Sequence, residues 1–268
     1  MKNCVVANLG SGKRDDNLTI ELKAQIENSL SLGWKPEDLW VVTNFPFSFM
    51  GINAFHLPLN TMCLTGSKMF ALRELFKANM INDVVWIHDL DAWQCVEFSP
   101  PDFKDIGVAS YSRPKFNGGS VFVRHAAADI VLKICEEIEA NKQQREEPTL
   151  DKVLKSATYR DRVTVLNSTW NVGCSGYVQR WYYADKPIRV VHFHPSNRIA
   201  WDTHTRNRNG ISADVTIPDN LRQLMLKYYG DIIKKFTYEG EPADPVMVRS
   251  VGVRGNVDLT KLESKRAK

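Results

Sequence analysis

Two aspartates within residues 84–93, Asp89 and Asp91, have the clearest capacity for chemistry in this chain. They are two residues apart, so on an extended backbone both carboxylates leave the same side of the strand. Two ionised carboxylates that close repel each other, and one tends to keep its proton. A divalent cation removes the conflict. Carboxylate oxygens suit Mg²⁺ or Mn²⁺, which complete their shells with water and nucleotide phosphates.

An Asp-x-Asp pair taken alone is more often a solvated strand end, because short motifs match by chance. The residues before this pair strengthen the metal interpretation. Residues 84–87, V-V-W-I, are apolar on both strand parities, which is typical of a central strand covered on both faces. Ligands of open α/β sheets bind at the carboxyl ends of such strands. We therefore expect Asp89 and Asp91 at the ligand-binding edge of a sheet.

The elements that position this pair follow from apolar periodicity. Helices are predicted from the Asp15–Asp16 pair to Gly33, over residues 67–78, 126–141 and 220–236, and from residue 147 onward. Strands are predicted at residues 4–7, 39–43, 84–87, 106–110, 120–123, 163–166 and 189–193. Their alternation predicts an α/β fold with a mainly parallel central sheet and helices on both faces.

Composition bounds the class of protein. The 268 residues are 43% hydrophobic and 25% charged, which is ordinary for a globular protein. The net charge of +4 is too small to indicate nucleic-acid binding by itself. Five widely spaced cysteines indicate neither a disulfide framework nor a thiolate zinc site. We found no signal-peptide pattern and no stretch long enough to span a membrane, so a cytoplasmic enzyme is expected.

Three further segments carry candidate ligand-binding residues. The glycine-bearing loop after the first strand lacks the P-loop spacing, but Asn8 and Gly10 could let the backbone approach a nucleotide. Lys68 lies in the first turn of a predicted helix, where the dipole disfavours a cation, so it is a candidate for facing an anion, although an exposed Lys is the commoner explanation. Arg198 belongs to a polar segment, residues 196–210, expected to cover an anionic ligand.

Four motifs in sequence order resemble those of the GT-A fold nucleotide-sugar glycosyltransferases, in particular the glycogenin-like and related families. D-L-D at residues 89–91 looks like their D-x-D, and F-N-G-G-S-V-F-V at residues 116–123 is similar to the strand that borders the donor sugar. E-E-P-T-L at residues 146–150 looks like the segment that places a carboxylate beside the sugar. V-H-F at residues 191–193 resembles the motif whose histidine binds the metal. The resemblance covers roughly residues 1–210.

The resemblance implies a metal site and a phosphate site. Asp89, Asp91 and His192 would bind Mn²⁺, or Mg²⁺, with Asp89 also touching the ribose; the imidazole ligand favours Mn²⁺. Lys68 and Arg198 would share the phosphate charge. The family often continues with Gly and Lys-Pro-Trp after its histidine, whereas residues 194–198 here read H-P-S-N-R, which leaves Arg198 as the phosphate contact.

It also implies a sugar site. Asn117, Gly118 and Glu147 would read the sugar hydroxyls of a UDP-sugar, a hexose donor. Glu147 or Asp151 could act as the base of an inverting transfer; without such a base the transfer is retaining, and the resemblance favours retaining. One GT-A domain is expected over residues 1–215, with a C-terminal helix and a short basic tail over residues 216–268.

Other functions stay open. A sugar-phosphate nucleotidyltransferase also combines a nucleotide, a divalent cation and a parallel sheet, and a catalytically silent GT-A module would keep the fold for binding alone. The acceptor could be a saccharide, a protein or a hydroxymethylated base in DNA, for which the arginines of residues 196–210 and the basic tail leave room.

Overall fold

A seven-stranded sheet forms the centre of the molecule in a computed structural model that describes residues 1–10, 16–112, 115–142, 145–173, 184–193 and 218–236. The strand order is β10-β8-β9-β6-β1-β2-β5. Strand β9 runs antiparallel to both of its neighbours, and the other pairings in this sheet are parallel. The strands are β1 (Lys2–Ala7), β2 (Leu39–Thr43), β5 (Phe55–His56), β6 (Val85–His88), β8 (Ile106–Ser112), β9 (Lys115–Val123) and β10 (Val163–Leu166).

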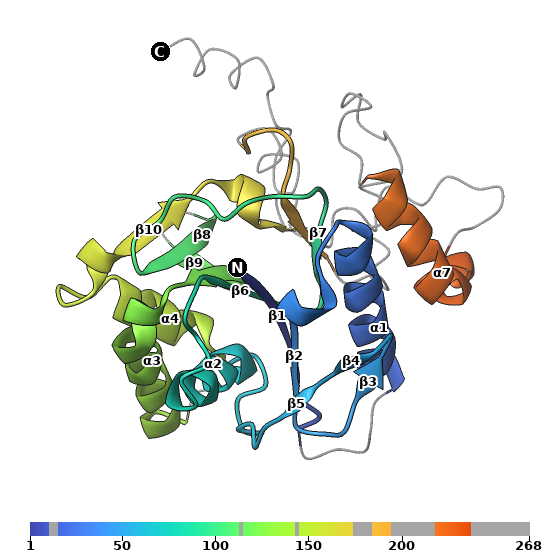
Figure 1. Ribbon diagram of the computed structural model, residues 1–268. Helices are drawn as coiled ribbons and strands as arrows, with labels where there is room; N and C mark the ends of the chain where they lie inside the picture. Colours follow the sequence, from blue (N-terminus) through green and yellow to red (C-terminus); the bar gives the residue numbers. More distant parts are fainter. Residues whose placement is uncertain (11–15, 113–114, 143–144, 174–183, 194–217, 237–268) are drawn as a thin grey trace, which may run out of the picture.

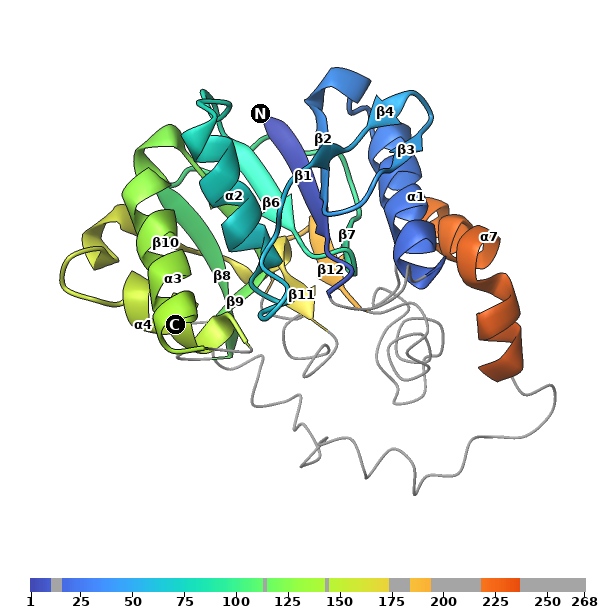
Figure 2. The ribbon, with the colours of Figure 1, turned by 90° about the horizontal axis from the view of Figure 1, so that it is seen from below.

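Helices cover both faces of this sheet (Figures 1 and 2). The helices are α1 (Asp16–Ser31), α2 (Ser67–Lys77), α3 (Ala128–Ala140), α4 (Glu147–Leu154) and α7 (Asp219–Phe236). Strand β1 shows why two layers form, because its side chains alternate between faces. Cys4 and Val6 pack with α2, α3 and α4, whereas Val5 and Ala7 pack with α1. The expected α/β fold with a mainly parallel sheet is confirmed.

A three-stranded sheet, ordered β11-β12-β7, packs beside α1. It contains β7 (Ala92–Gln94), β11 (Val172–Gly173) and β12 (Val190–His192). Helix α7 covers it together with α1 through Leu221, Met225 and Tyr229. The division at residue 215 stays a prediction, because residues 194–217 lie outside the described part of the chain.

Smaller elements complete the connections. They are the hairpin of β3 (Ser48–Phe49) and β4 (Ile52–Asn53), and the 3₁₀ turns η1 (Pro36–Asp38), η2 (His125–Ala127), η3 (Arg160–Arg162) and η4 (Ser168–Trp170). Among the residues that the structure describes, no helix combines the length and apolar character needed to cross a bilayer.

The strand predicted at residues 120–123 is longer than expected. It is part of β9, which begins at Lys115, so residues 116–119 with their two glycines lie inside the strand and not before it. A side chain at Gly118 and one at Gly119 would therefore point to opposite faces of the strand. The consequence is a strand with no side chain on either face at the point where it passes the end of β6.

Candidate metal and sugar-nucleotide site

Asp89 and Asp91 lie in a turn directly after β6. The Ala92 N–H donates to the Asp89 carbonyl at 3.0 Å, which closes the turn. Both aspartates are held through their backbones, because the Asp89 N–H donates to the Gly119 carbonyl at 3.0 Å and the Phe193 N–H donates to the Asp91 carbonyl at 2.9 Å. The carboxylates are thus brought together by a turn and not by the extended backbone that their spacing suggested.

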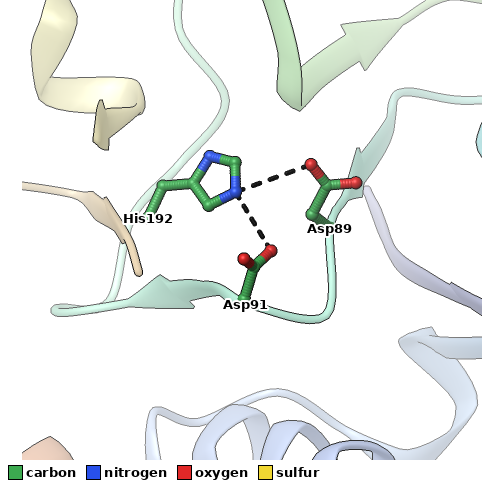
Figure 3. Close-up of side chains that lie close together, drawn as sticks. All are labelled: Asp89, Asp91 and His192. Atoms are coloured by element: carbon green, nitrogen blue, oxygen red, sulfur yellow. Dashed lines mark hydrogen bonds and ion pairs between the residues drawn. The ribbon is translucent and has the colours of Figure 1, made fainter. Parts of the chain in front are cut away.

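The third residue of the cluster, His192, ends β12, which pairs antiparallel with β7 so that His192 lies opposite Ala92. Its Nε2 lies 3.0 Å from Asp91 Oδ1 and 3.6 Å from Asp89 Oδ2. Figure 3 shows this nitrogen facing both carboxylates. Burial opposes protonation of this imidazole, but the two carboxylates outweigh that effect and raise the pKa of His192. In the absence of a metal, the two aspartates therefore favour a proton on His192.

These three side chains have the donor atoms and spacing of a divalent-cation site. One ligand atom from each of them lies within 4.8 Å of the others. Ligands of Mg²⁺ sit about 2.1 Å from the ion and thus at most about 4.2 Å apart, so small side-chain rotations suffice. Two carboxylates are hard ligands and the imidazole is a softer one, so this set favours Mn²⁺ over the harder Mg²⁺. The donor set fits such an ion.

Lys68 and Glu146 form a buried ion pair beside this cluster. Lys68 Nζ lies 2.9 Å from Glu146 Oε1 and also pairs with Asp89. Burial disfavours the ammonium charge, but the two carboxylates outweigh it and raise the pKa of Lys68, so the side chain stays charged. Glu146 is buried, and among the described residues its Oε2 has no hydrogen-bond partner. An unpartnered buried carboxylate oxygen is costly, which indicates a place for a ligand's donor group.

The burial of Glu146 predicts an unusual pH dependence of stability. Burial raises its pKa from 4.5 to about 7, although Lys68 opposes the rise. Between those pH values the unfolded chain has lost a proton that the folded chain keeps, so the free energy of unfolding falls as the pH rises. Glu146→Gln should remove this slope, and because it also removes a partner of the buried Lys68 it should lower stability at both pH values. Urea unfolding at pH 5 and pH 8 measures it; equal slopes in both proteins would contradict the assignment.

Because the two glycines of β9 have no side chains, one functional side chain packs against the strand on each face. A Cβ on Gly118 would lie 2.1 Å from Glu146 Oε1, on the face covered by α4. A Cβ on Gly119 would lie 2.3 Å from His192 Nδ1, on the face covered by the three-stranded sheet. Since Cβ atoms essentially never approach that closely, neither position tolerates a side chain without displacing its partner. The bare backbone of β9 is therefore a requirement of the site.

No protein-family model and no curated protein matches this chain. Solved structures do. The chain is similar to an active-site mutant of LgtC, with a TM-score of 0.52 and 15% identity over 84% of this chain and 95% of that one. The glycosyltransferase GlyE of Streptococcus pneumoniae gives a TM-score of 0.54 and 12% identity, over 90% of this chain and 66% of that one.

A third similar structure is the galactosyltransferase LgtC in complex with donor and acceptor sugar analogs, with a TM-score of 0.50 and 13% identity over 85% of this chain and 96% of that one. The chain has the GT-A fold of glycosyltransferases. At these identities the likeness establishes the GT-A architecture, and the chemistry has to be argued from the residues.

Relative to this GT-A sheet, the predicted nucleotide residues lie at the carboxyl end of β1. The Asn8 amide donates to the Asn60 carbonyl and to Ser67 Oγ, both at 2.8 Å, and its Oδ1 accepts from the Gly10 N–H at 3.1 Å. Gly10 has a φ of +64°, which favours glycine. Asn8 thus joins the loop after β1 to the start of α2. A contact of Asn8 or Gly10 with the nucleotide stays a prediction, and Arg198 lies outside the described residues.

The predicted carboxylates of α4 occupy different positions. Asp151 Oδ1 accepts from the Phe116 N–H at 3.1 Å and pairs with Lys155, so it fastens α4 to the start of β9. Glu147 is half-buried in the first turn of α4. The carboxylate that the structure brings to the metal cluster is Glu146, through Lys68. The catalytic roles predicted for Glu147 and Asp151 stay predictions.

Sequence reasoning assigned no defined role to three residues of the site. Besides Glu146, these are Asn171, whose side chain contacts His192, and His88, which supports the turn. His88 is stacked on Trp86, and burial lowers its pKa to about 3, so it is neutral. Its Nδ1 lies 2.9 Å from the Asp89 carbonyl. His88 continues the apolar run of β6 as a polar residue on a buried strand, and that was the available signal.

Proposed function

We propose that this chain is a metal-dependent glycosyltransferase that moves a hexose from a UDP-sugar to a hydroxyl acceptor. The observation that carries the proposal is the convergence of Asp89, Asp91 and His192 beside the buried pair of Lys68 and Glu146. A cation site next to a buried ammonium suits a diphosphate, and a buried carboxylate with an unpartnered oxygen suits a sugar hydroxyl.

In this proposal each residue has a defined task. Asp89, Asp91 and His192 hold Mn²⁺, which supplies Lewis-acid stabilisation of the leaving diphosphate when bound. Lys68 keeps a fixed positive charge close to the phosphates, since two carboxylates maintain its protonation. Glu146 Oε2 accepts a hydrogen bond from a donor-sugar hydroxyl and so orients the ring.

We propose a retaining transfer. The bond between the anomeric carbon and the diphosphate oxygen breaks, and its electron pair leaves with the UDP. The acceptor oxygen then bonds to the same face of that carbon, and its proton passes to the departing diphosphate. Glu147 or Asp151 as the base of an inverting transfer is the alternative, and the anomeric configuration of the product distinguishes the two. The acceptor classes and the cytoplasmic location expected from the sequence stay predictions.

The test is product analysis with the full chain. A panel of UDP-sugars is incubated with Mn²⁺, and free UDP is measured with and without saccharide, protein or hydroxymethylated-DNA acceptors. We expect UDP release that EDTA abolishes and added Mn²⁺ restores. Formation of a sugar phosphate from UDP-sugar and pyrophosphate would instead indicate a nucleotidyltransferase. Binding of a UDP-sugar without any turnover in Mn²⁺ would indicate a silent GT-A module.

Mn²⁺ binding is expected to stabilise the folded chain. A ligand that binds only the native state adds about 2.7 kcal/mol at a free concentration 100 times its Kd. Thermal unfolding should therefore shift upward with Mn²⁺, and the shift should grow when UDP is also present. The Asp91→Ala variant provides the control, because it keeps the fold but loses a ligand. An equal shift in that variant would place the ion elsewhere.

A further inference from the structure

Asn171 contacts the imidazole of His192 on the side opposite the two aspartates. Its Oδ1 lies 3.2 Å from His192 Nδ1, whereas Nε2 of the same ring lies 3.0 Å from Asp91. Asn171 is 1% exposed and directly precedes β11, whose Gly173 pairs with His192. We propose that Asn171 is the positioning residue that holds His192 in its metal-binding tautomer. This inference rests on the metal site of the proposed function.

The backbone N–H of Gly119 fixes the donor and acceptor in each hydrogen bond from Asn117 through Asn171 to His192. The Gly119 N–H can only donate, and it donates to Asn117 Oδ1 at 2.8 Å. That oxygen accepts a second hydrogen bond from Asn171 Nδ2 at 2.5 Å. With its nitrogen committed to Asn117, Asn171 presents Oδ1 to His192, and an oxygen can only accept. Nδ1 of His192 must therefore carry the proton.

This order of donors decides which imidazole nitrogen is available to a metal. Neutral imidazole has one N–H and one lone pair. When Nδ1 carries the hydrogen, the lone pair lies on Nε2, the atom that faces Asp89 and Asp91. A partner on the far nitrogen fixes both the tautomer and the ring orientation of a metal-binding histidine. Asn171 supplies that partner as a neutral amide, which adds no charge to the site.

The same chain of contacts joins the metal ligand to the sugar side of the site. Asn117 and Gly119 have the same strand parity in β9, so both meet the three-stranded sheet that carries His192. A Cβ on Gly119 would lie 2.7 Å from Asn117 Oδ1, so the bare glycine is also what admits this amide. Movement of Asn117 would therefore reach His192 through Asn171.

The test measures Mn²⁺ affinity of the full chain without any donor, by calorimetry, at a pH above the raised pKa of His192. Asn171→Ala should weaken Mn²⁺ binding by about 10- to 100-fold, which is the usual effect of losing the outer partner of a metal ligand. The imidazole ¹⁵N shifts supply a second readout in the protein loaded with diamagnetic Mg²⁺, because without a metal Nε2 also faces an acceptor, Asp91. We expect a single Nδ1–H tautomer in the parent protein and a mixture in Asn171→Ala.

Two further variants separate positioning from folding. Asn171→Asp keeps an acceptor for Nδ1–H but loses the donor to Asn117 Oδ1, so it should recover only part of the affinity lost in Asn171→Ala. Asn167→Ala removes a side chain that caps η4 by accepting from the Thr169 N–H at 2.9 Å, without touching His192. It should lower stability but leave the Kd for Mn²⁺ unchanged. Equal losses in Asn171→Ala and Asn167→Ala would reduce Asn171 to a structural residue and overturn the inference.

Failure of the proposed function looks different in this experiment. If the parent protein binds no Mn²⁺, the metal site itself is absent and both proposals fall. If the parent binds Mn²⁺ and Asn171→Ala binds it equally well with the same tautomer, only the role of Asn171 is overturned.

Discussion

Replacing His192 with alanine is expected to lower Mn²⁺-dependent UDP release by about 10³-fold. A bound cation supplies several kcal/mol of charge stabilisation, and about 4 kcal/mol corresponds to a factor near 10³ in rate. His192 is the neutral ligand of the three, so its loss leaves two carboxylates on a turn with no third donor among the described residues of the cluster. Steady-state kinetics at saturating Mn²⁺ measure the effect.

The control for this prediction is another histidine. His125 lies at the opposite end of the sheet, where its Nδ1 is 2.8 Å from the Ile81 carbonyl that precedes β6. His125→Ala should keep the parent activity. Retention of activity in His192→Ala, at Mn²⁺ concentrations that saturate the parent, would show that the histidine does not hold the ion.

The pH dependence of Mn²⁺ binding should identify the same residue. The aspartates raise the pKa of His192 in the metal-free protein, against the effect of burial. A proton on Nε2 excludes the metal, so the affinity should fall as the pH drops through that raised pKa and recover as the pH rises. In His192→Ala the remaining affinity should lack this step. An identical pH profile in both proteins would assign the proton to another group.

The central sheet could be predicted from the sequence because its strands are apolar runs bounded by polar residues or glycines. Residues 39–43 were predicted with the bounds that β2 has, and residues 84–87 differ from β6 by one position at each end. The three-stranded sheet was harder. Only β12 was predicted, within residues 189–193. Strands β7 and β11 contain three and two residues, too few for a period to be visible, and their partners are distant in the sequence.

The site could be predicted in part, for a related reason. His192 and Asp91 are 101 residues apart, and only the resemblance of the motifs suggested that they meet. Glu146 and Glu147 are adjacent, and the sequence alone does not show which of the two carboxylates lies in the site. Burial separates them, because Glu146 is 2% exposed and pairs with Lys68, and burial follows from the packing of α4 on β9. Local sequence therefore gave the chemistry of the groups but not their partners.

The glycines of β9 give the second large prediction, because adjacent alanine substitutions should damage different functions. In Gly119→Ala the new Cβ would lie 2.3 Å from Nδ1 and 2.4 Å from Cε1 of His192, so the imidazole must move away from the aspartates. We expect Mn²⁺ affinity and UDP release both to fall by more than about 10²-fold. Loss of the outer partner of a metal ligand costs up to about 10²-fold, and displacement of the ligand itself should cost more. Overpacking of this kind also costs about 1–3 kcal/mol of stability.

In Gly118→Ala the clash falls on Glu146 Oε1, 2.1 Å from the new Cβ, and His192 is untouched because it lies on the other face of β9. UDP release should fall by a similar factor while the Kd for Mn²⁺ stays near the parent value. Gly230→Ala in α7 is the matched control, since nothing lies within 4 Å of its Cβ position and alanine favours a helix. If both β9 variants lose Mn²⁺ affinity equally, the two faces of the strand do not serve metal binding and sugar binding separately. The proposed role of Glu146 in sugar binding would then be wrong.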